Sequence, residues 1–246
     1  MCTDSGAFLK DKRAWANALL KSQLLDDALP DVTFYMNESG GQRVREVIED
    51  ALLRALSNEG VTLANLSTGA VPTARAAPLF IISESLGSKI VVDSLQEFES
   101  NPRSQAFARQ ARGNIHSLFL LANQIPLLNL GEQDSYGHPD SYQHLKKFAQ
   151  ARSDFRRGRL SDSPLQIVAF SDPNDLLSYQ LQSDAVPRQD AVISNVIVSN
   201  DCTYFGLVEN PDTAHTHYFE TTPVANAIAH GSAAVGTSVG SRCAKK

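Results

Sequence analysis

Apolar residues along the chain form short continuous runs that alternate with segments of helical spacing. Short runs bounded by turn-forming residues are typical of parallel strands buried on both faces. They cover residues 79–82, 115–122, 165–170 and 192–198, and residues 31–36 form a fifth segment rich in β-forming residues. Helical spacing occurs over residues 7–29, 44–56, 90–98, 142–155 and 224–229. This order predicts an α/β fold, a mostly parallel sheet with helices on both faces.

Length and composition indicate one large domain. With 246 residues and 42% hydrophobic residues, the chain can bury a substantial core. We expect a single domain over residues 1–230, in which the irregular segment 131–163 is a lid-like insertion. Residues 231–246 are small and polar and predict a flexible tail.

Charge and cysteine content exclude several classes of function. The net charge of -5 comes from 22 basic and 27 acidic side chains, which argues against nucleic acid as a partner. Cys2, Cys202 and Cys243 are too far apart for a CxxC metal site or a disulfide scaffold. No signal peptide and no run of 18 apolar residues is present, so we expect a soluble, cytoplasmic protein without a membrane span.

Residues 37–41 contain two glycines before a helical segment, an arrangement that can bind phosphate. The segment lacks the Lys and Ser/Thr of a phosphate-binding loop, so it predicts an ordinary strand-to-helix turn. We therefore expect no cofactor and no metal.

Residues 83–87, Ser-Glu-Ser-Leu-Gly, separate an apolar run from a helical segment. Ser85 stands at the apex of this predicted turn, where a strained backbone projects the side chain out of the core. Such a serine is placed for nucleophilic attack. The alternative is that Ser85 only caps the following helix.

An acid and a base follow in later loops. A serine hydroxyl needs an imidazole to take its proton, and the imidazole needs a carboxylate to orient it. Asp172 and Asp175 follow the run 165–170, and His215 and His217 follow the run 192–198. Because loops after parallel strands meet at one sheet edge, these groups are expected to lie near Ser85.

This arrangement resembles the lipase and esterase side of the α/β-hydrolase superfamily, over roughly residues 31–231. The resemblance rests on the elbow at 83–87, with Ser83 in place of the usual glycine, and on the chain order Ser, Asp, His. It implies that Ser85 is the nucleophile and that the Leu86 backbone N–H is one oxyanion donor. The implied reaction is cleavage of a small-molecule ester.

The resemblance also favours one acid and one base. Family acids usually lie several residues beyond the strand end, which favours Asp175 over Asp172. The segment His-Thr-His-Tyr-Phe is similar to a family pattern in which a histidine precedes an aromatic pair, which favours His215 over His217.

The chain departs from the family before the elbow. Only one predicted strand, over residues 31–36, precedes Ser85, and no His-Gly pair that could give a second oxyanion donor occurs there. The pattern therefore predicts an N-terminally shortened hydrolase with an open sheet edge. A non-catalytic protein that pairs with a partner or a second copy through that edge is the alternative.

Overall fold

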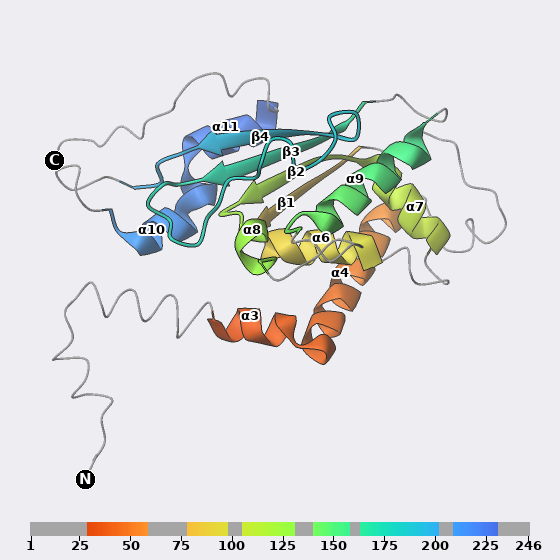
Figure 1. Ribbon diagram of the computed structural model, residues 1–246, viewed down its shortest axis with the longest axis horizontal. Coiled ribbons are helices and arrows are strands. Elements are labelled where there is room, and N and C mark those ends of the chain that lie inside the picture. Colours follow the sequence, from red (N-terminus) through yellow and green to blue (C-terminus); the bar gives the residue numbers. More distant parts are fainter. Residues whose placement is uncertain are drawn as a thin grey trace, which may run out of the picture. The chain divides into compact units, whose positions relative to one another are not determined.

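A computed structural model of the chain describes residues 29–58, 78–97, 105–130, 140–157, 163–201 and 209–230 (Figure 1). The chain divides into two compact units, Met1–Val44 and Arg45–Lys246, and each is treated by itself. All but the last residue of the helix predicted over 7–29, and the whole tail 231–246, lie outside the described residues. The single domain expected over residues 1–230 stays a prediction.

The described part of the first unit consists of helix α3, Leu29–Met36, and the start of helix α4, Glu38–Asn58. The strand predicted over residues 31–36 is therefore wrong. β-Forming residues favour a strand mainly through packing against neighbouring strands. Pro30 and Asp31 instead lie in the first turn of α3, where a missing N–H is harmless and a negative charge is favourable.

The turn predicted at residues 37–41 also differs, because both of its glycines lie inside α4. Asn37 caps this helix, since its Oδ1 accepts the N–H of Ser39 at 3.2 Å and of Gly40 at 3.4 Å. A Cβ atom at Gly40 would collide with the carbonyl of Phe34. The glycine therefore permits the sharp corner between α3 and α4. The helix predicted over 44–56 is confirmed.

The second unit is built on a four-stranded parallel sheet of order β1-β2-β3-β4. Its strands are β1 (Leu79–Glu84), β2 (Ile115–Leu121), β3 (Leu165–Ser171) and β4 (Ala191–Ile197). All four apolar runs are thus confirmed as strands, with bounds that differ by no more than two residues. The α/β class follows from this sheet and the helices packed on it.

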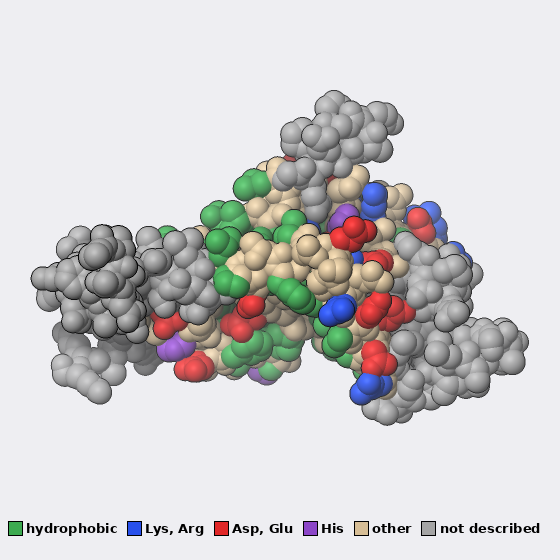
Figure 2. Space-filling model, turned by 90° about the horizontal axis from the view of Figure 1, so that it is seen from below, with side chains coloured by type: hydrophobic (Ala, Val, Ile, Leu, Met, Phe, Trp, Pro, Cys, Tyr) green, Lys and Arg blue, Asp and Glu red, His purple; other side chains and the backbone are tan. Residues whose placement is uncertain are grey.

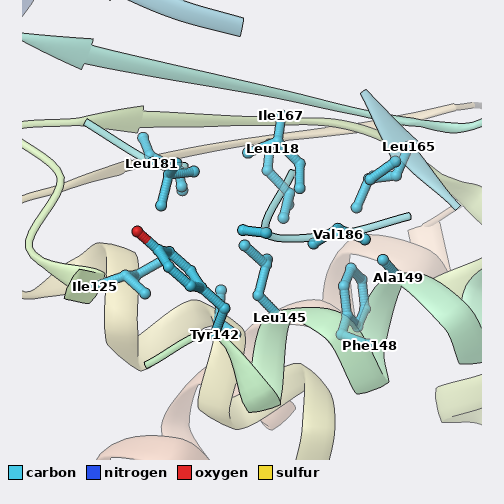
Figure 3. Packing of buried hydrophobic residues seen from close by; sticks show 14 of the residues in the cluster. Leu118, Ile125, Tyr142, Leu145, Phe148, Ala149, Leu165, Ile167, Leu181 and Val186 are labelled. Carbon is cyan, nitrogen blue, oxygen red and sulfur yellow. The ribbon is translucent and has the colours of Figure 1, made fainter. Parts of the chain in front are cut away.

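One face of the sheet packs on helices α6 (Gly87–Glu97) and α9 (Gln143–Arg156) (Figure 1). Figure 3 shows the α9 side chains Leu145 and Phe148 facing Leu118, Ile167 and other residues of the strands. α9 is also the main described part of the predicted 131–163 insertion. One face of this helix packs into the core and covers the sheet.

The opposite face packs on the C-terminal helices, chiefly α11 (Thr222–His230). Strand periodicity assigns alternate residues to the two faces: Leu118 and Leu120 join the first core, whereas Phe119 and Leu121 join the second. Tyr218, fully buried, belongs to this second core. The sheet is therefore covered on both faces, which explains why its strands read as continuous apolar runs.

Helix α7 (Gln105–Asn114) was missed, because its polar composition predicts only a connecting segment. It ends at the start of β2 and packs against α9. A Cβ atom at Gly113 would collide with the ring of Phe155, so this glycine lets the two helices approach closely.

In the part of the chain that is described, no helix combines the length and hydropathy needed to cross a bilayer. On the face drawn in Figure 2, acidic, basic and hydrophobic side chains are intermixed, and the basic ones do not form a continuous stripe.

Candidate functional site

Ser85 lies in the turn between β1 and α6. Its backbone φ is 55°, a left-handed conformation that costs a non-glycine residue about 1–3 kcal/mol. Two hydrogen bonds hold the turn: Ser85 N donates to Leu121 O at 2.9 Å, and Ser88 N donates to Ser85 O at 3.0 Å. The predicted strained turn with a serine at its apex is therefore present at the carboxyl end of β1.

The Ser85 hydroxyl contacts a histidine 130 residues further along the chain. Ser85 Oγ lies 2.9 Å from Nε2 of His215. His215 belongs to the short helix α10 (Pro211–Thr216), which begins after Asn210, whose side chain accepts the N–H of Asp212. Helix α10, which follows β4 in the chain, thus places this imidazole at the edge of the sheet where β1 ends.

The other ring nitrogen of His215 faces a carboxylate. Nδ1 lies 2.9 Å and 3.0 Å from the two carboxylate oxygens of Asp175. Since a carboxylate only accepts hydrogen bonds, Nδ1 of the neutral ring carries the proton and Nε2 presents its lone pair to Ser85. The Ser85 hydroxyl therefore donates to His215, which is the direction that proton removal requires.

Asp175 is held by two further donors. Its Oδ1 accepts the N–H of Leu177 at 2.9 Å, and its Oδ2 accepts the hydroxyl of Tyr218 at 3.1 Å. Burial, with the charge of Asp175 adding to it, raises the pKa of Tyr218, so the phenol stays protonated and remains a donor. Asp175 is only 4% exposed, and its carboxylate is compensated by these bonds and by His215.

The competing acid, Asp172, has a different environment. Its Oδ1 accepts the N–H of Asn174 at 2.9 Å, and its Oδ2 accepts the N–H of Asn200 at 2.7 Å. These bonds join the loop after β3 to the loop after β4. Asp172 therefore stabilises the loops from which the residues of the site project.

The competing histidine, His217, begins the 3-10 helix η3 (His217–Glu220), one residue beyond α10. Its carbonyl accepts the Thr221 hydroxyl at 2.8 Å. The structure brings Ser85, His215 and Asp175 together in one chain of hydrogen bonds, and neither Asp172 nor His217 is part of that chain.

Leu86 follows Ser85 directly, and its carbonyl accepts the N–H groups of Lys89 and Ile90, each at 3.1 Å. The N–H of Leu86 shares a trans peptide group with Ser85 O, which accepts the N–H and the hydroxyl of Ser88. This N–H therefore points the opposite way from that carbonyl, at the start of α6, where backbone N–H groups have no intrahelical acceptor. This is the geometry in which a backbone N–H can stabilise a developing oxyanion.

Two residues in contact with these groups were not predicted. Gln124 lies just beyond β2, and its Nε2 donates to Ser85 Oγ at 2.8 Å. Tyr218 is the donor to Asp175. Gln124 follows β2 and Tyr218 follows β4 in the chain, but neither residue type carries a signal of such a role.

Two acidic side chains near the site have raised pKa values. Burial raises the pKa of Glu84, the charge of His215 opposes the shift, and the charge of Asp175 adds to it. Burial, followed by the charge of Asp172, raises the pKa of Glu209 to about 7. The Glu209 carboxylate accepts the N–H of Asp201 at 3.1 Å.

Comparisons with protein-family models, with curated proteins and with solved structures yield no match to this chain. Within the described ranges, no three His, Cys, Asp or Glu side chains are grouped so that they could hold a metal ion. The geometry around Ser85 is therefore the feature of this chain that indicates a function.

Proposed function

We propose that this protein is a serine hydrolase of the α/β-hydrolase type that cleaves carboxylic esters through an acyl-enzyme. The observation that carries the proposal is the continuous hydrogen-bond chain from Ser85 through His215 to Asp175, which begins at a strained turn. Serine capping alone would explain neither the imidazole at 2.9 Å nor the buried carboxylate behind it. The parallel sheet and the chain order Ser, Asp, His support the same assignment.

In the proposed first half-reaction, Ser85 Oγ attacks the ester carbonyl carbon while its proton moves to His215 Nε2. The carbonyl oxygen becomes an oxyanion, towards which the Leu86 N–H donates. The carbon–oxygen bond to the alcohol then breaks, and His215 gives its proton to the leaving alkoxide. Asp175 stays ionised throughout and stabilises the imidazolium.

In the second half-reaction, water takes the position of the departed alcohol. His215 removes a proton from the water, whose oxygen attacks the acyl carbon. The bond between that carbon and Ser85 Oγ breaks, and His215 returns the proton to Oγ. The products are a carboxylic acid and the regenerated hydroxyl.

Hydrolysis of p-nitrophenyl butyrate tests this proposal. We expect turnover by the wild type and loss of turnover in Ser85→Ala, with Ser194→Ala, a half-buried serine on β4, as the matched control. Equal rates in wild type and Ser85→Ala, with both proteins folded, would contradict the proposal.

A binding role through the sheet edge is the second candidate. Among the described strands, β1 pairs with β2 alone, and its side chains Phe80 and Ile82 are 55% and 43% exposed. An edge strand with exposed apolar side chains is a surface on which another strand can pair. Light scattering after size-exclusion chromatography tests this role. Self-association that Phe80→Lys and Ile82→Lys both abolish would support it, and a monomeric wild type would exclude pairing between copies.

A further inference from the structure

Gln124 is a buried amide in direct contact with the hydroxyl of Ser85. The residue is 3% exposed, and its Nε2 lies 2.8 Å from Ser85 Oγ. Since the Ser85 O–H donates to His215, the hydroxyl oxygen must accept from Gln124. The amide therefore directs an N–H at the atom that would attack the substrate.

The position of Gln124 is fixed through Ser88. The fully buried Ser88 hydroxyl donates to Ser85 O at 2.7 Å and accepts the N–H of Gln124 at 3.1 Å. One side chain thus joins the β1–α6 turn to the segment after β2. On the other side, the carbonyl of Gln124 accepts the N–H of Leu128 at 3.0 Å, at the start of the short helix α8 (Ile125–Leu128). The backbone of Gln124 is therefore held on both sides, which keeps its side-chain amide within reach of Ser85.

We propose that the Nε2–H of Gln124 is a second oxyanion donor, acting together with the Leu86 N–H. This inference rests on the proposed function. When Oγ bonds to the carbonyl carbon, the oxyanion lies only two covalent bonds from Oγ. A donor already within 2.8 Å of Oγ reaches it by a small rotation of the side chain. At the same time, the lone pair of Oγ that accepted this N–H becomes the new bond, which releases the amide.

In this proposal the second donor comes from the segment that follows β2, in the second unit. The sequence before Ser85 contains no His-Gly pair, so a donor from the segment after β2 would complete the site. If the Gln124 amide served only as a hydrogen-bond donor to the Ser85 hydroxyl, its loss would not weaken the binding of a tetrahedral analogue more than the binding of the substrate.

Kinetics of Gln124→Leu and Gln124→Glu with p-nitrophenyl butyrate test the role. Loss of one oxyanion donor lowers kcat by about 10²–10³-fold, and we expect this loss in Gln124→Leu with KM nearly unchanged. Gln124→Glu is expected to be slower still, because its carboxylate would repel the oxyanion. Inhibition by an aryl trifluoromethyl ketone, which forms a tetrahedral adduct with serine, is expected to weaken by a factor similar to the loss in kcat/KM.

Gln166→Leu is the matched control, because Gln166 Nε2 donates to Pro164 O at the amino end of β3, away from Ser85. If Gln124→Leu does not fold, Gln124→Asn takes its place, since it keeps an amide that is too short to reach. An active wild type with kcat retained in the folded Gln124 variant, or with unchanged ketone affinity, would overturn the oxyanion role alone. A wild type that does not turn over esters would overturn the proposed function and this role with it.

Discussion

The two ends of the parallel sheet use buried polar side chains in different ways. At the amino end, the fully buried Arg152 donates to two backbone carbonyls, to Ile115 O at 2.6 Å and to Ser163 O at 3.1 Å. At the carboxyl end, Asp175 and His215 bond to each other, and the chain of contacts ends on the Ser85 hydroxyl.

This difference separates a structural role from a chemical one. A guanidinium that bonds to backbone carbonyls satisfies their need for a donor, and it has no proton to pass on at neutral pH. A carboxylate, an imidazole and a hydroxyl in series can move a proton from one end to the other. The amino end is therefore expected to determine stability, and the carboxyl end to determine activity.

The largest effect is expected for Asp175→Asn. The amide can present its NH₂ group to Nδ1, which favours the wrong tautomer of His215, and a change of this kind lowers kcat by about 10⁴-fold. Steady-state ester hydrolysis measures it. Asp172→Asn is the comparison. Because Asp172 bonds to loop N–H groups, its replacement should lower the free energy of unfolding and should reduce kcat much less than Asp175→Asn does. If Asp172→Asn cost more in kcat than Asp175→Asn, the assignment of the acid would be wrong.

Arg152→Met tests the amino end. The carbonyls of the buried Ile115 and the half-buried Ser163 lose their donor. Removal of a desolvated guanidinium, whose pKa burial lowers to about 10, offsets part of the cost. We expect the free energy of unfolding to fall by about 1–3 kcal/mol, with kcat unchanged below the unfolding transition. Urea denaturation measures the loss. Arg157→Met, at a side chain that is 70% exposed, should change it by less than about 0.5 kcal/mol.

Tyr218→Phe removes the donor to Asp175 and the acceptor of the Asp172 N–H, which lies 2.7 Å from the phenol oxygen. We expect a loss of stability of about 1–2 kcal/mol and a decrease in kcat of roughly tenfold, because the carboxylate is less firmly oriented. Tyr142→Phe, on the other face of the sheet, removes an acceptor of the Gln182 N–H. That control should leave kcat unchanged, and an equal loss in both variants would show that the Tyr218 hydroxyl has no specific role.

Glu209→Gln should give the smallest effect, a change in pH dependence. The folded-state pKa of Glu209 is raised from 4.5 to about 7, so the folded protein binds the proton more tightly than the unfolded chain does. Its contribution to stability is fully present below pH 4.5 and is lost as the pH rises towards 7. Glutamine mimics the protonated carboxyl, so thermal unfolding should show the variant gaining Tm relative to wild type over this range. A difference in Tm that is constant with pH would contradict the raised pKa.

Much of the second unit could be predicted from the sequence, because strands buried on both faces leave a direct signal in their apolar runs. The strand predicted over residues 31–36 is wrong because β-forming residues adopt the structure that their neighbours permit. Pro30 and Asp31 favour the start of a helix there. Helix α7 was missed because its polar composition favours a connecting segment.

The site was predictable in its chemistry and less so in its choice of residues. Ser85 follows from the turn, and the later acids and histidines from their place after strands. Preference for Asp175 and His215 came from a family resemblance, and the contacts of Asp172 with Asn174 and Asn200 could not be read from the sequence. Gln124 shows the limit most clearly, since a glutamine after a strand has no distinctive pattern until its amide is found at 2.8 Å from Ser85 Oγ.

Labelling by a fluorophosphonate probe, with the adduct located by mass spectrometry, tests whether Ser85 is an activated nucleophile. We expect one adduct in the native protein, on Ser85, with no adduct on this peptide in Ser85→Ala or in heat-denatured wild type. We also expect slower labelling in Asp175→Asn, because His215 would be a poorer base. An unlabelled native protein, or equal labelling of Ser85→Ala, would contradict the assignment of Ser85 as a nucleophile.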